Sequence, residues 1–371
     1  LLTRNVTKML AVLMVDFSCA LKLSMPIAVL SAMRESSSYH ISVKGGRFLE
    51  AVSKADTVVF DKTGTLTYAT PKVAQIVTFG GHEASEMLRL AACLEEHYPH
   101  SMANAVVDEA KRQNLKHEEY HSQVQYVVAH GISSMVEGKK VLIGSAHFVF
   151  EDEGCTIPAA EQEKFDTLDA QYSHLYLCIA GELVAVICIF DPLRAEAKDA
   201  IRALHACGIS KVVMMTGDNR RTAASVAEEV GVDEFYAEVL PEDKAAFIRR
   251  EKAAGRTVIM IGDGVNDSPA LSEADAGVAI STGAAIAREI ADITIASEDL
   301  FELVTLRRIS EALMGRIHRN YRFIVGFNLG LIVFGVAGLL PPTTSALLHN
   351  ASTLAISLKS MTNLLPDKKK I

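Results

Sequence analysis

Apolar residues form long stretches near the two ends of the chain and short runs between them. Residues 9–33 are 25 mostly apolar positions, enough to cross a bilayer core of about 30 Å. Asp16, Lys22 and Pro26 lie inside this stretch, and polar groups within a span usually face a bundle interior or an ion path. The pattern predicts a membrane span; the alternative is a buried helix of a soluble protein.

Two more apolar segments lie toward the other end. Residues 323–340 form an apolar segment of 18 residues followed by two prolines, and residues 343–365 are a weaker segment that contains His349, Asn350 and Lys359. Residues 34–55, after the first span, are polar and helical in character. We expect the order membrane, cytosolic α/β region, membrane.

The region between the spans alternates between helical and strand patterns. A short β-branched and aromatic run, 57–60, predicts a buried strand that ends at Asp61. Further helices are expected at 195–206, 221–230, 244–254 and 268–274, and strands at 211–215, 257–261, 277–279 and 293–295. This alternation favours a parallel sheet with helices on both faces.

Residues 72–189 interrupt that alternation and predict an inserted α+β domain. Its expected strands are 124–128, 134–136, 140–144 and 175–190, and its expected helices are 87–94 and 102–111. The domains we expect are a first span (1–33), a linker with the first part of the core domain (34–71), the insert (72–189), the second part of the core domain (190–315), and two further spans (316–371).

Charge and cysteine content argue against some classes of function and site. The 371 residues carry a net charge of −8, and the only dense basic run is Lys368–Lys370, which fits a membrane flank better than a nucleic-acid contact. The six cysteines contain no CxxC pair, so neither a disulfide framework nor a zinc site is expected. Because the chain begins at Leu1 and shows no signal peptide, we expect it to be a piece of a longer protein.

The strongest chemical motif is Asp61-Lys62-Thr63-Gly64-Thr65-Leu66-Thr67. An aspartate at a strand end is placed to attack phosphorus as a carboxylate nucleophile. Lys62 supplies positive charge there, and Thr63 offers a hydroxyl group near a phosphate. The alternative, an ordinary strand-to-helix turn, does not explain why all these residue types occur together.

This motif resembles the phosphorylation motif of the P-type ATPases, and the resemblance covers essentially the whole chain. It implies an α/β fold: a haloacid dehalogenase-like, Rossmannoid phosphorylation domain with an inserted α+β nucleotide-binding domain, flanked by transmembrane helices. It implies ATP and Mg²⁺ as cofactors. It also implies that Thr216 and Gly217 bind a phosphoryl group together with Asp218, and that Lys244 neutralises charge on it.

The resemblance assigns Mg²⁺ to Gly262-Asp263-Gly264-Val265-Asn266-Asp267 and the first motif. Asp263 and Asp61 would hold the cation, with Thr63 and Asp267 beside it, and Asn266 would reach the phosphate. Two carboxylates four positions apart suit a hard cation that keeps some waters. A calcium loop is the alternative, but it needs more oxygen ligands than this segment has.

Thr63 also bears on the reaction. Many phosphatases of this fold carry an aspartate at that position as general acid and base. Its replacement by threonine predicts that the aspartyl-phosphate persists, which favours an energy-coupling intermediate over a simple phosphatase.

Residues 95–103 of the insert resemble the nucleotide-binding motif of the heavy-metal branch of this family. His100 would contact the adenine, with His97 as a competing assignment, and Glu95 would support the pocket. Gly131 and Gly144 resemble the glycine-bearing strands of the same pocket.

The metal-site residues of the heavy-metal branch have partial counterparts here. Cys19, with Ser18 beside it, lies where the branch usually carries Cys-Pro-Cys; Asn328 and His349 resemble its polar membrane residues. This ligand set favours a borderline transition metal and leaves Zn²⁺, Cd²⁺, Mn²⁺ and Co²⁺ open. The missing second cysteine weighs against Cu⁺.

We therefore expect ATP-driven export of a transition metal through an aspartyl-phosphate, by a multi-pass protein of a membrane (the plasma membrane in a bacterium) with cytoplasmic catalytic domains. The expected partners are ATP, the metal and the lipid bilayer, and no nucleic acid. The alternatives are a membrane-tethered phosphatase or phosphotransferase of the same fold and a non-catalytic regulatory fragment. The Thr-Gly-Glu motif of the family's actuator domain is absent from this sequence.

Overall fold

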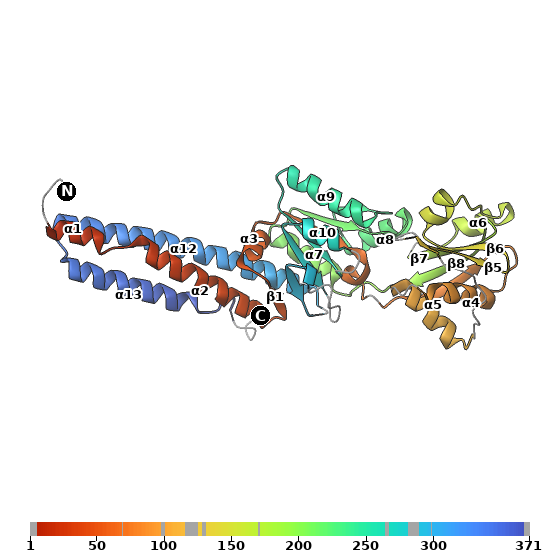
Figure 1. Ribbon diagram of the computed structural model, residues 1–371, viewed down its shortest axis with the longest axis horizontal. Coiled ribbons are helices and arrows are strands. Elements are labelled where there is room, and N and C mark those ends of the chain that lie inside the picture. The colour runs from red at the N-terminus through yellow and green to blue at the C-terminus, as the bar shows by residue number, and fades with distance from the viewer. Residues whose placement is uncertain are drawn as a thin grey trace. The chain divides into compact units, whose positions relative to one another are not determined.

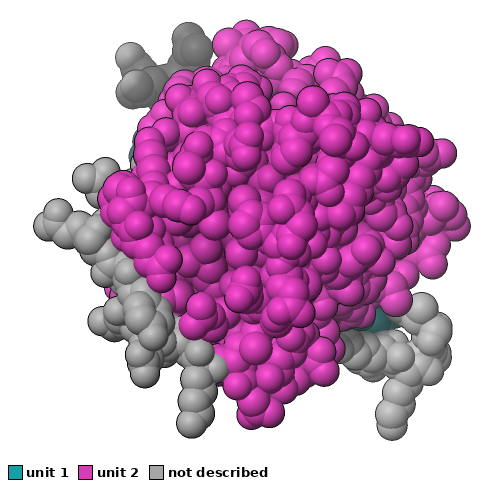
Figure 2. Space-filling model, turned by 90° about the vertical axis from the view of Figure 1, so that its right-hand side faces the viewer, with its two compact units in different colours: residues 1–55, 292–371 teal, residues 56–291 magenta. Residues whose placement is uncertain are grey.

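The computed structural model describes residues 6–68, 70–97, 101–115, 125–127, 131–169, 171–263, 267–280, 289–297 and 299–366. The chain divides into two compact units, coloured separately in Figure 2. We call residues 1–55 with 292–371 the helical unit and residues 56–291 the α/β unit. Figure 2 shows one face of the α/β unit.

In the helical unit, the helices α1 (Val6–Leu13) and α2 (Phe17–Ser37) follow each other along the length of two others, α12 (Phe301–Ala337) and α13 (Pro342–Ser360) (Figure 1). Among the described residues, α12 alone is long and apolar enough to cross a membrane by length and composition. The apolar segment expected at 323–340 is the second half of this 37-residue helix, and the segment expected at 343–365 is α13.

The first expected span is not one helix. Helix α1 ends at Leu13 and α2 begins at Phe17, so the break falls within the stretch that we predicted as continuous over 9–33. Asp16 lies in the break, directly before the first residue of α2. Pro26, by contrast, lies inside α2 without ending it.

The segment after α2 is not wholly helical either. Residues 41–43 form a strand, β1 (Ile41–Val43), which pairs antiparallel with β13 (Ile293–Ile295). Ile41 and Val43 are buried and Ser42 is exposed, which is the alternation of a half-buried strand. The expected helix in this region is shorter, α3 (Gly46–Lys54).

A buried arginine joins α3 to α12. The guanidinium group of Arg307 donates to the carbonyl oxygens of Val52 and Ala55, the latter at 3.1 Å, and it pairs with Glu311 at 2.8 Å. These two carbonyl groups lie in the last turn of α3 and just after it, where helical carbonyls have no partner within the helix. Arg307 therefore fixes the end of α3 against the first turns of α12.

The core of the α/β unit is a parallel sheet with the strand order β12–β11–β2–β9–β10. Its strands are β2 (Thr57–Asp61), β9 (Lys211–Met215), β10 (Glu234–Tyr236), β11 (Val258–Gly262) and β12 (Ala276–Ile280). Its helices are α7 (Ala197–Ala206), α8 (Arg220–Val230), α9 (Pro241–Ala253) and α10 (Ser268–Glu273). The expected alternation is thus confirmed, except that β13 pairs with β1 and runs antiparallel to it.

Apolar packing covers both faces of this sheet. Val59 and Met260, from neighbouring strands, pack in one cluster with Phe247 of α9 and Leu271 of α10. All five residues of β2 are buried, so the side chains that point to the opposite face are covered as well. This explains why the strand appears in the sequence as a continuous apolar run rather than an alternating one.

The insert forms a second, antiparallel sheet with the order β3–β8–β7–β6–β5–β4. Its strands are β3 (Lys72–Thr78), β4 (Gln125–Val127), β5 (Gly131–Val136), β6 (Lys139–Gly144), β7 (Ser173–Ile179) and β8 (Glu182–Phe190). Its helices are α4 (Ala84–Glu95) and α5 (Ser101–Arg112), with the short turns η2 (His147–Asp152), η3 (Ala159–Glu161) and α6 (Gln162–Asp166). The single strand expected over 175–190 is a hairpin, because Ala180 and Gly181 reverse the chain.

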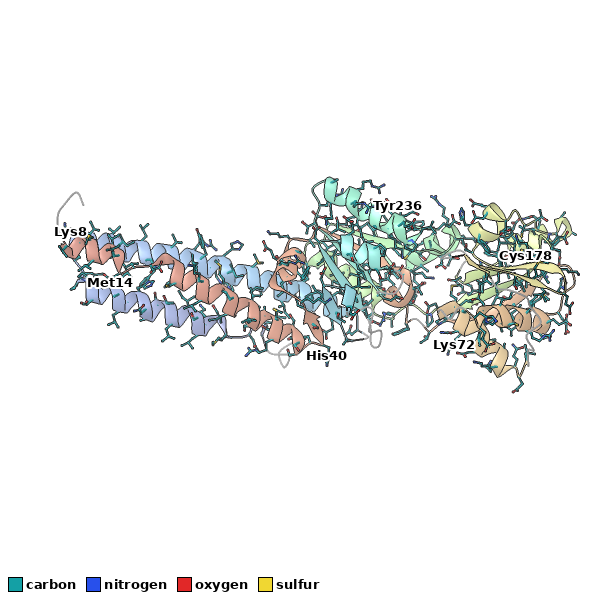
Figure 3. The ribbon with its side chains drawn as sticks, in the orientation of Figure 1. Lys8, Met14, His40, Lys72, Cys178 and Tyr236 are labelled. Atoms are coloured by element: carbon teal, nitrogen blue, oxygen red, sulfur yellow. The ribbon has the colours of Figure 1, made fainter. Side chains whose placement is uncertain are left out.

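Each face of the inserted sheet has its own core. Leu88 of α4 and Val106 of α5 pack against Leu177 on one face, and Phe148 packs with Cys178 on the other. Figure 3 shows Cys178 among the strands of this sheet. The chain enters and leaves the insert side by side, because Lys72 at the start of β3 pairs with Phe190 at the end of β8 (Lys72 is labelled in Figure 3).

We predict that Gly131→Ala lowers the free energy of unfolding by about 1–3 kcal/mol, the usual cost of overpacking. A Cβ atom at this position would lie 2.5 Å from the carbonyl oxygen of Ile143 and 2.5 Å from the ring of Phe148. Chemical denaturation of the purified chain in detergent measures the effect. Gly45→Ala is the matched control, because its nearest neighbour would be 3.8 Å away; equal stability of the two variants would contradict this packing.

Candidate active site

Two neighbouring parallel strands bring the predicted carboxylates to one edge of the core sheet. Phe60 of β2 pairs with Ile261 of β11, and the next residues along these strands are Asp61 and Gly262, followed by Asp263. Carboxyl ends of parallel strands form the ligand-binding edge of such sheets. The structure therefore places Asp61 and Asp263 where their positions in the sequence predicted.

Lys244 lies between two buried carboxylates at this edge. Its Nζ atom is 2.5 Å from Asp61 Oδ1 and 2.7 Å from Asp267 Oδ1. The side chain of Asp267 is only 1% exposed and that of Lys244 is 8% exposed. One ammonium group is thus shared by two carboxylates, which leaves the cluster with an excess negative charge.

This cluster changes the proton affinity of its members. Burial raises the pKa of Asp61 to about 6; Lys244 opposes that rise and the neighbouring Asp267 adds to it. Burial also raises the pKa of Asp267. Burial acts to lower the pKa of Lys244, but the two carboxylates outweigh it and raise that pKa above its ordinary value, so the lysine stays charged.

Gly262 makes room for Asp267, a role that the sequence did not reveal. A Cβ atom at Gly262 would lie 2.5 Å from Asp267 Oδ2, so only glycine allows this carboxylate to lie against the end of β11. Asp267 Oδ2 is buried and has no hydrogen-bond partner among the described residues. A buried carboxylate oxygen without a donor is a suitable ligand for a cation.

The donor set fits Mg²⁺. No group of three His, Cys, Asp or Glu side chains in the described part of the chain is placed to hold a metal on its own. Mg²⁺ does not need such a group, because it is usually bound by one or two carboxylates together with water and substrate phosphate oxygens. Asp61 and Asp267, which share the Lys244 ammonium group, supply two such carboxylates, and Asp263 follows the end of β11 beside them.

The second predicted phosphate-binding element lies beside the first. Asp61 pairs with Met215 of β9, so Thr216 begins the adjacent loop. The Thr216 hydroxyl donates to Asp218 Oδ2 at 3.0 Å and accepts from the backbone N–H of Asp218 at 3.1 Å. Gly217 lies between them and is exposed, with no atom closer than 3.9 Å to a Cβ built there.

Lys62 is buried and forms an ion pair with Asp218. Burial acts to raise the pKa of Asp218, but Lys62 outweighs it and holds that pKa below its ordinary value. Thr63, next along the loop, has an extended backbone (φ −74°, ψ 127°) within the tight turn η1 (Lys62–Leu66). The two loops that we predicted to bind phosphate are therefore joined by a charged contact.

The residues predicted to bind nucleotide are only partly described. Gly131 and Gly144 lie directly opposite each other on β5 and β6, as a shared pocket requires. The space beside Gly131 is filled by Ile143 and Phe148, so packing alone explains this glycine. Glu95 is buried at the end of α4. His100 and Asn266 lie outside the described residues.

Two of the four residues predicted to bind the transported metal meet inside the helical unit. Asn328 Oδ1 of α12 is 3.2 Å from His349 Nδ1 of α13, and both side chains are buried. Cys19 is exposed on α2, and Ser18 lies in the first turn of that helix.

A buried serine that the sequence did not single out lies on the same helix as His349. Ser345 is one helical turn before His349, and its hydroxyl oxygen has no partner among the described residues. Asn328 Nδ2 is likewise buried without a partner there. The spacing of four residues from His349 is a signal that could have identified Ser345.

Comparison with known proteins agrees with this geometry. The family described as haloacid dehalogenase-like hydrolase matches residues 55–275. The chain is 36% identical over 359 residues to a manganese-exporting P-type ATPase of Mycobacterium tuberculosis, which covers 96% of this chain and 50% of the relative. It is 35% identical over 363 residues to a probable copper-exporting P-type ATPase V of the same species, which covers 96% and 46%.

Solved structures show the same relationship. A zinc-transporting PIB-type ATPase crystallised in an E2.Pi state superposes with a TM-score of 0.65 at 32% identity, over 92% of this chain and 55% of that one. The predicted haloacid dehalogenase-like fold is confirmed. The chain spans about half the length of the curated relatives described here. It therefore belongs to the haloacid dehalogenase-like hydrolases, and its relatives within them are the heavy-metal P-type ATPases.

Proposed function

We propose that this chain carries the phosphorylation chemistry of an ATP-driven exporter of a transition-metal cation. The observation that supports this most directly is the Asp61–Lys244–Asp267 cluster at the carboxyl edge of the parallel sheet. P-type ATPases in general use ATP and Mg²⁺, and the relatives named above are exporters or transporters of manganese, copper or zinc.

In the proposed reaction, Asp61 attacks the γ-phosphorus of ATP. A bond forms between a carboxylate oxygen of Asp61 and phosphorus, the bond from phosphorus to the β–γ bridging oxygen breaks, and ADP leaves with the electron pair. Lys244 lies against Asp61 and is placed to neutralise the transferring group. Thr216 would donate to a phosphoryl oxygen in place of Asp218 Oδ2, and the position of Lys62 is fixed by Asp218.

Mg²⁺, held by Asp61, Asp263 and Asp267 with Thr63 beside them, would neutralise the phosphate charge that otherwise repels the attacking carboxylate. The inserted sheet is our candidate for the nucleotide-binding domain, and Glu95, His100, Gly131 and Gly144 are the residues that we propose to bind ATP. The extent of strands β3 to β8, from Lys72 to Phe190, supports the boundaries 72–189 that we propose for this domain. A phosphatase role has less support, because position 63 is threonine.

We place the metal path in the helical unit and several spans in a membrane, with the catalytic domains on its cytoplasmic side. The long apolar helix α12 and the buried pair of Asn328 and His349 support this. Cys19 and Ser18 are the further ligands that we propose. The ligand types leave zinc, cadmium, manganese and cobalt as candidates.

We predict that brief incubation with γ-labelled ATP and Mg²⁺ labels the chain, and that Asp61→Asn removes the label. An acyl phosphate survives an acid quench and is released by hydroxylamine, because it is an activated carboxyl derivative. Gel autoradiography after each treatment measures it. Asp199→Asn, at an exposed site on α7, is the matched control; a label that persists in Asp61→Asn would refute the proposed nucleophile.

We predict that the Asp61 carboxyl group titrates near pH 6 in the Mg²⁺-free protein, following its pKa of about 6. The nucleophilic carboxylate is present above that pH and is lost as the pH falls through it. Carbon-13 NMR of labelled aspartate measures the midpoint, with Asp61→Asn to assign the signal. Lys244→Met should move the midpoint upward because it removes the main charge that opposes burial; a midpoint near 4 would contradict this environment.

We predict that His349→Ala lowers the affinity of the chain for Zn²⁺ by at least about tenfold. Even the loss of a residue that only orients a metal ligand lowers metal affinity about 10–100-fold. Equilibrium dialysis of the detergent-solubilised chain with metal analysis measures the binding. Ser352→Ala is the control, because the Ser352 hydroxyl donates to the backbone carbonyl of His349 on the same helix. Undiminished binding by His349→Ala would remove this residue from the metal site.

A further inference from the structure

The start of strand β7 in the insert contacts both phosphate-binding loops of the core domain. The hydroxyl oxygen of Ser173 accepts a hydrogen bond from Lys62 Nζ at 3.0 Å. Lys62 follows the nucleophile Asp61 directly and also pairs with Asp218. Because 111 positions separate Lys62 from Ser173, nothing in the local sequence indicates this contact.

The residues on either side of Ser173 are also bound to the core domain. The backbone carbonyl of Tyr172 accepts from the Thr222 hydroxyl at 2.9 Å, and His174 Nδ1 lies 3.4 Å from Asn219 Nδ2. Asn219 at the same time caps helix α8, because its Oδ1 accepts from the backbone N–H of Thr222 at 3.0 Å. Of three consecutive residues of the insert, Ser173 thus contacts the first phosphate-binding loop, and Tyr172 and His174 contact the N-cap and first turn of the helix that follows the second.

These contacts are buried rather than superficial. Lys62, Ser173 and Thr222 are 4%, 5% and 1% exposed. A hydrogen bond between buried groups is not easily replaced by one to water, and a bond to a charged group is among the stronger ones. Losing one of them would therefore loosen the insert from the catalytic loops.

We propose that the segment Tyr172–His174, which we call the β7 contact, sets the position of the inserted domain relative to Asp61. Ser173 and Thr222 are then positioning residues. The inference rests on the proposed function, in which ATP is bound by the insert and its γ-phosphate must reach Asp61. Reacting atoms must come within about 3–3.5 Å, and an error of about 1 Å can cost about 100-fold in rate.

A choice of phosphate donor separates this role from a purely structural one. ATP depends on the inserted domain to reach Asp61. Acetyl phosphate has no base or ribose, and it phosphorylates the same carboxylate with acetate as the leaving group. A change in domain position therefore slows transfer from ATP, whereas damage to the catalytic loops slows transfer from both donors.

The experiment measures single-turnover phosphoenzyme formation from each donor in the full chain. We expect Ser173→Ala and Thr222→Val to slow labelling from ATP about tenfold and labelling from acetyl phosphate less than about twofold. Ser210→Ala, whose hydroxyl bonds to the Asp56 carbonyl in an exposed part of the core domain, is the control and should change neither rate. The inference would be overturned if labelling slowed equally with both donors, or if labelling from ATP did not slow at all.

Hydrogen exchange provides a second measurement that does not depend on catalysis. Peptides covering 172–177 and 216–222 should exchange faster in Ser173→Ala and Thr222→Val than in Ser210→Ala. Unchanged exchange in both variants would overturn the β7 contact, whatever the phosphorylation assay gives. If the chain without substitutions accepts phosphate from neither donor, the proposed function is contradicted. Hydrogen exchange alone would then test the β7 contact.

Discussion

The ammonium group of Lys244 lies between the carboxylates of Asp61 and Asp267, and the arrangement of the catalytic edge depends on it. Two buried carboxylates side by side would repel each other and take up a proton. A lysine in the first turn of α9 offsets part of this repulsion and keeps one negative charge in excess. That remaining charge suits the edge to a divalent cation and, through the cation, to a phosphate ester.

The sequence pattern predicted an element correctly where the residues of that element alone determine its conformation. Strand β2 was predicted almost to the residue, because a fully buried parallel strand is a continuous apolar run. The hairpin of β7 and β8 was read as one strand, because both arms are apolar and the reversal at Ala180–Gly181 is short. Strand β1 was missed, because a three-residue strand is defined by its partner β13 and not by its own composition.

The residues of the candidate site also differ in whether local sequence or tertiary contacts reveal them. Asp61, Thr216, Lys244 and Asp263 lie in motifs whose order along the chain indicates their role. Ser173 lies in the insert and reaches Lys62 only through the tertiary fold, so no spacing could have identified it. In the helical unit, helical periodicity cannot say which helix faces which, and it did not separate the buried Asn328 from the exposed Cys19.

The side-by-side entry and exit of the insert has a consequence for how the chain folds. Strands β2 and β9 are neighbours in the core sheet, yet the whole insert separates them along the chain. Closing so long a loop is entropically unfavourable and slow. Once β3 and β8 have paired, Lys72 and Phe190 are adjacent, and the loop that remains to be closed is short. We therefore expect the insert to fold first and to act as the template that lets the catalytic sheet assemble.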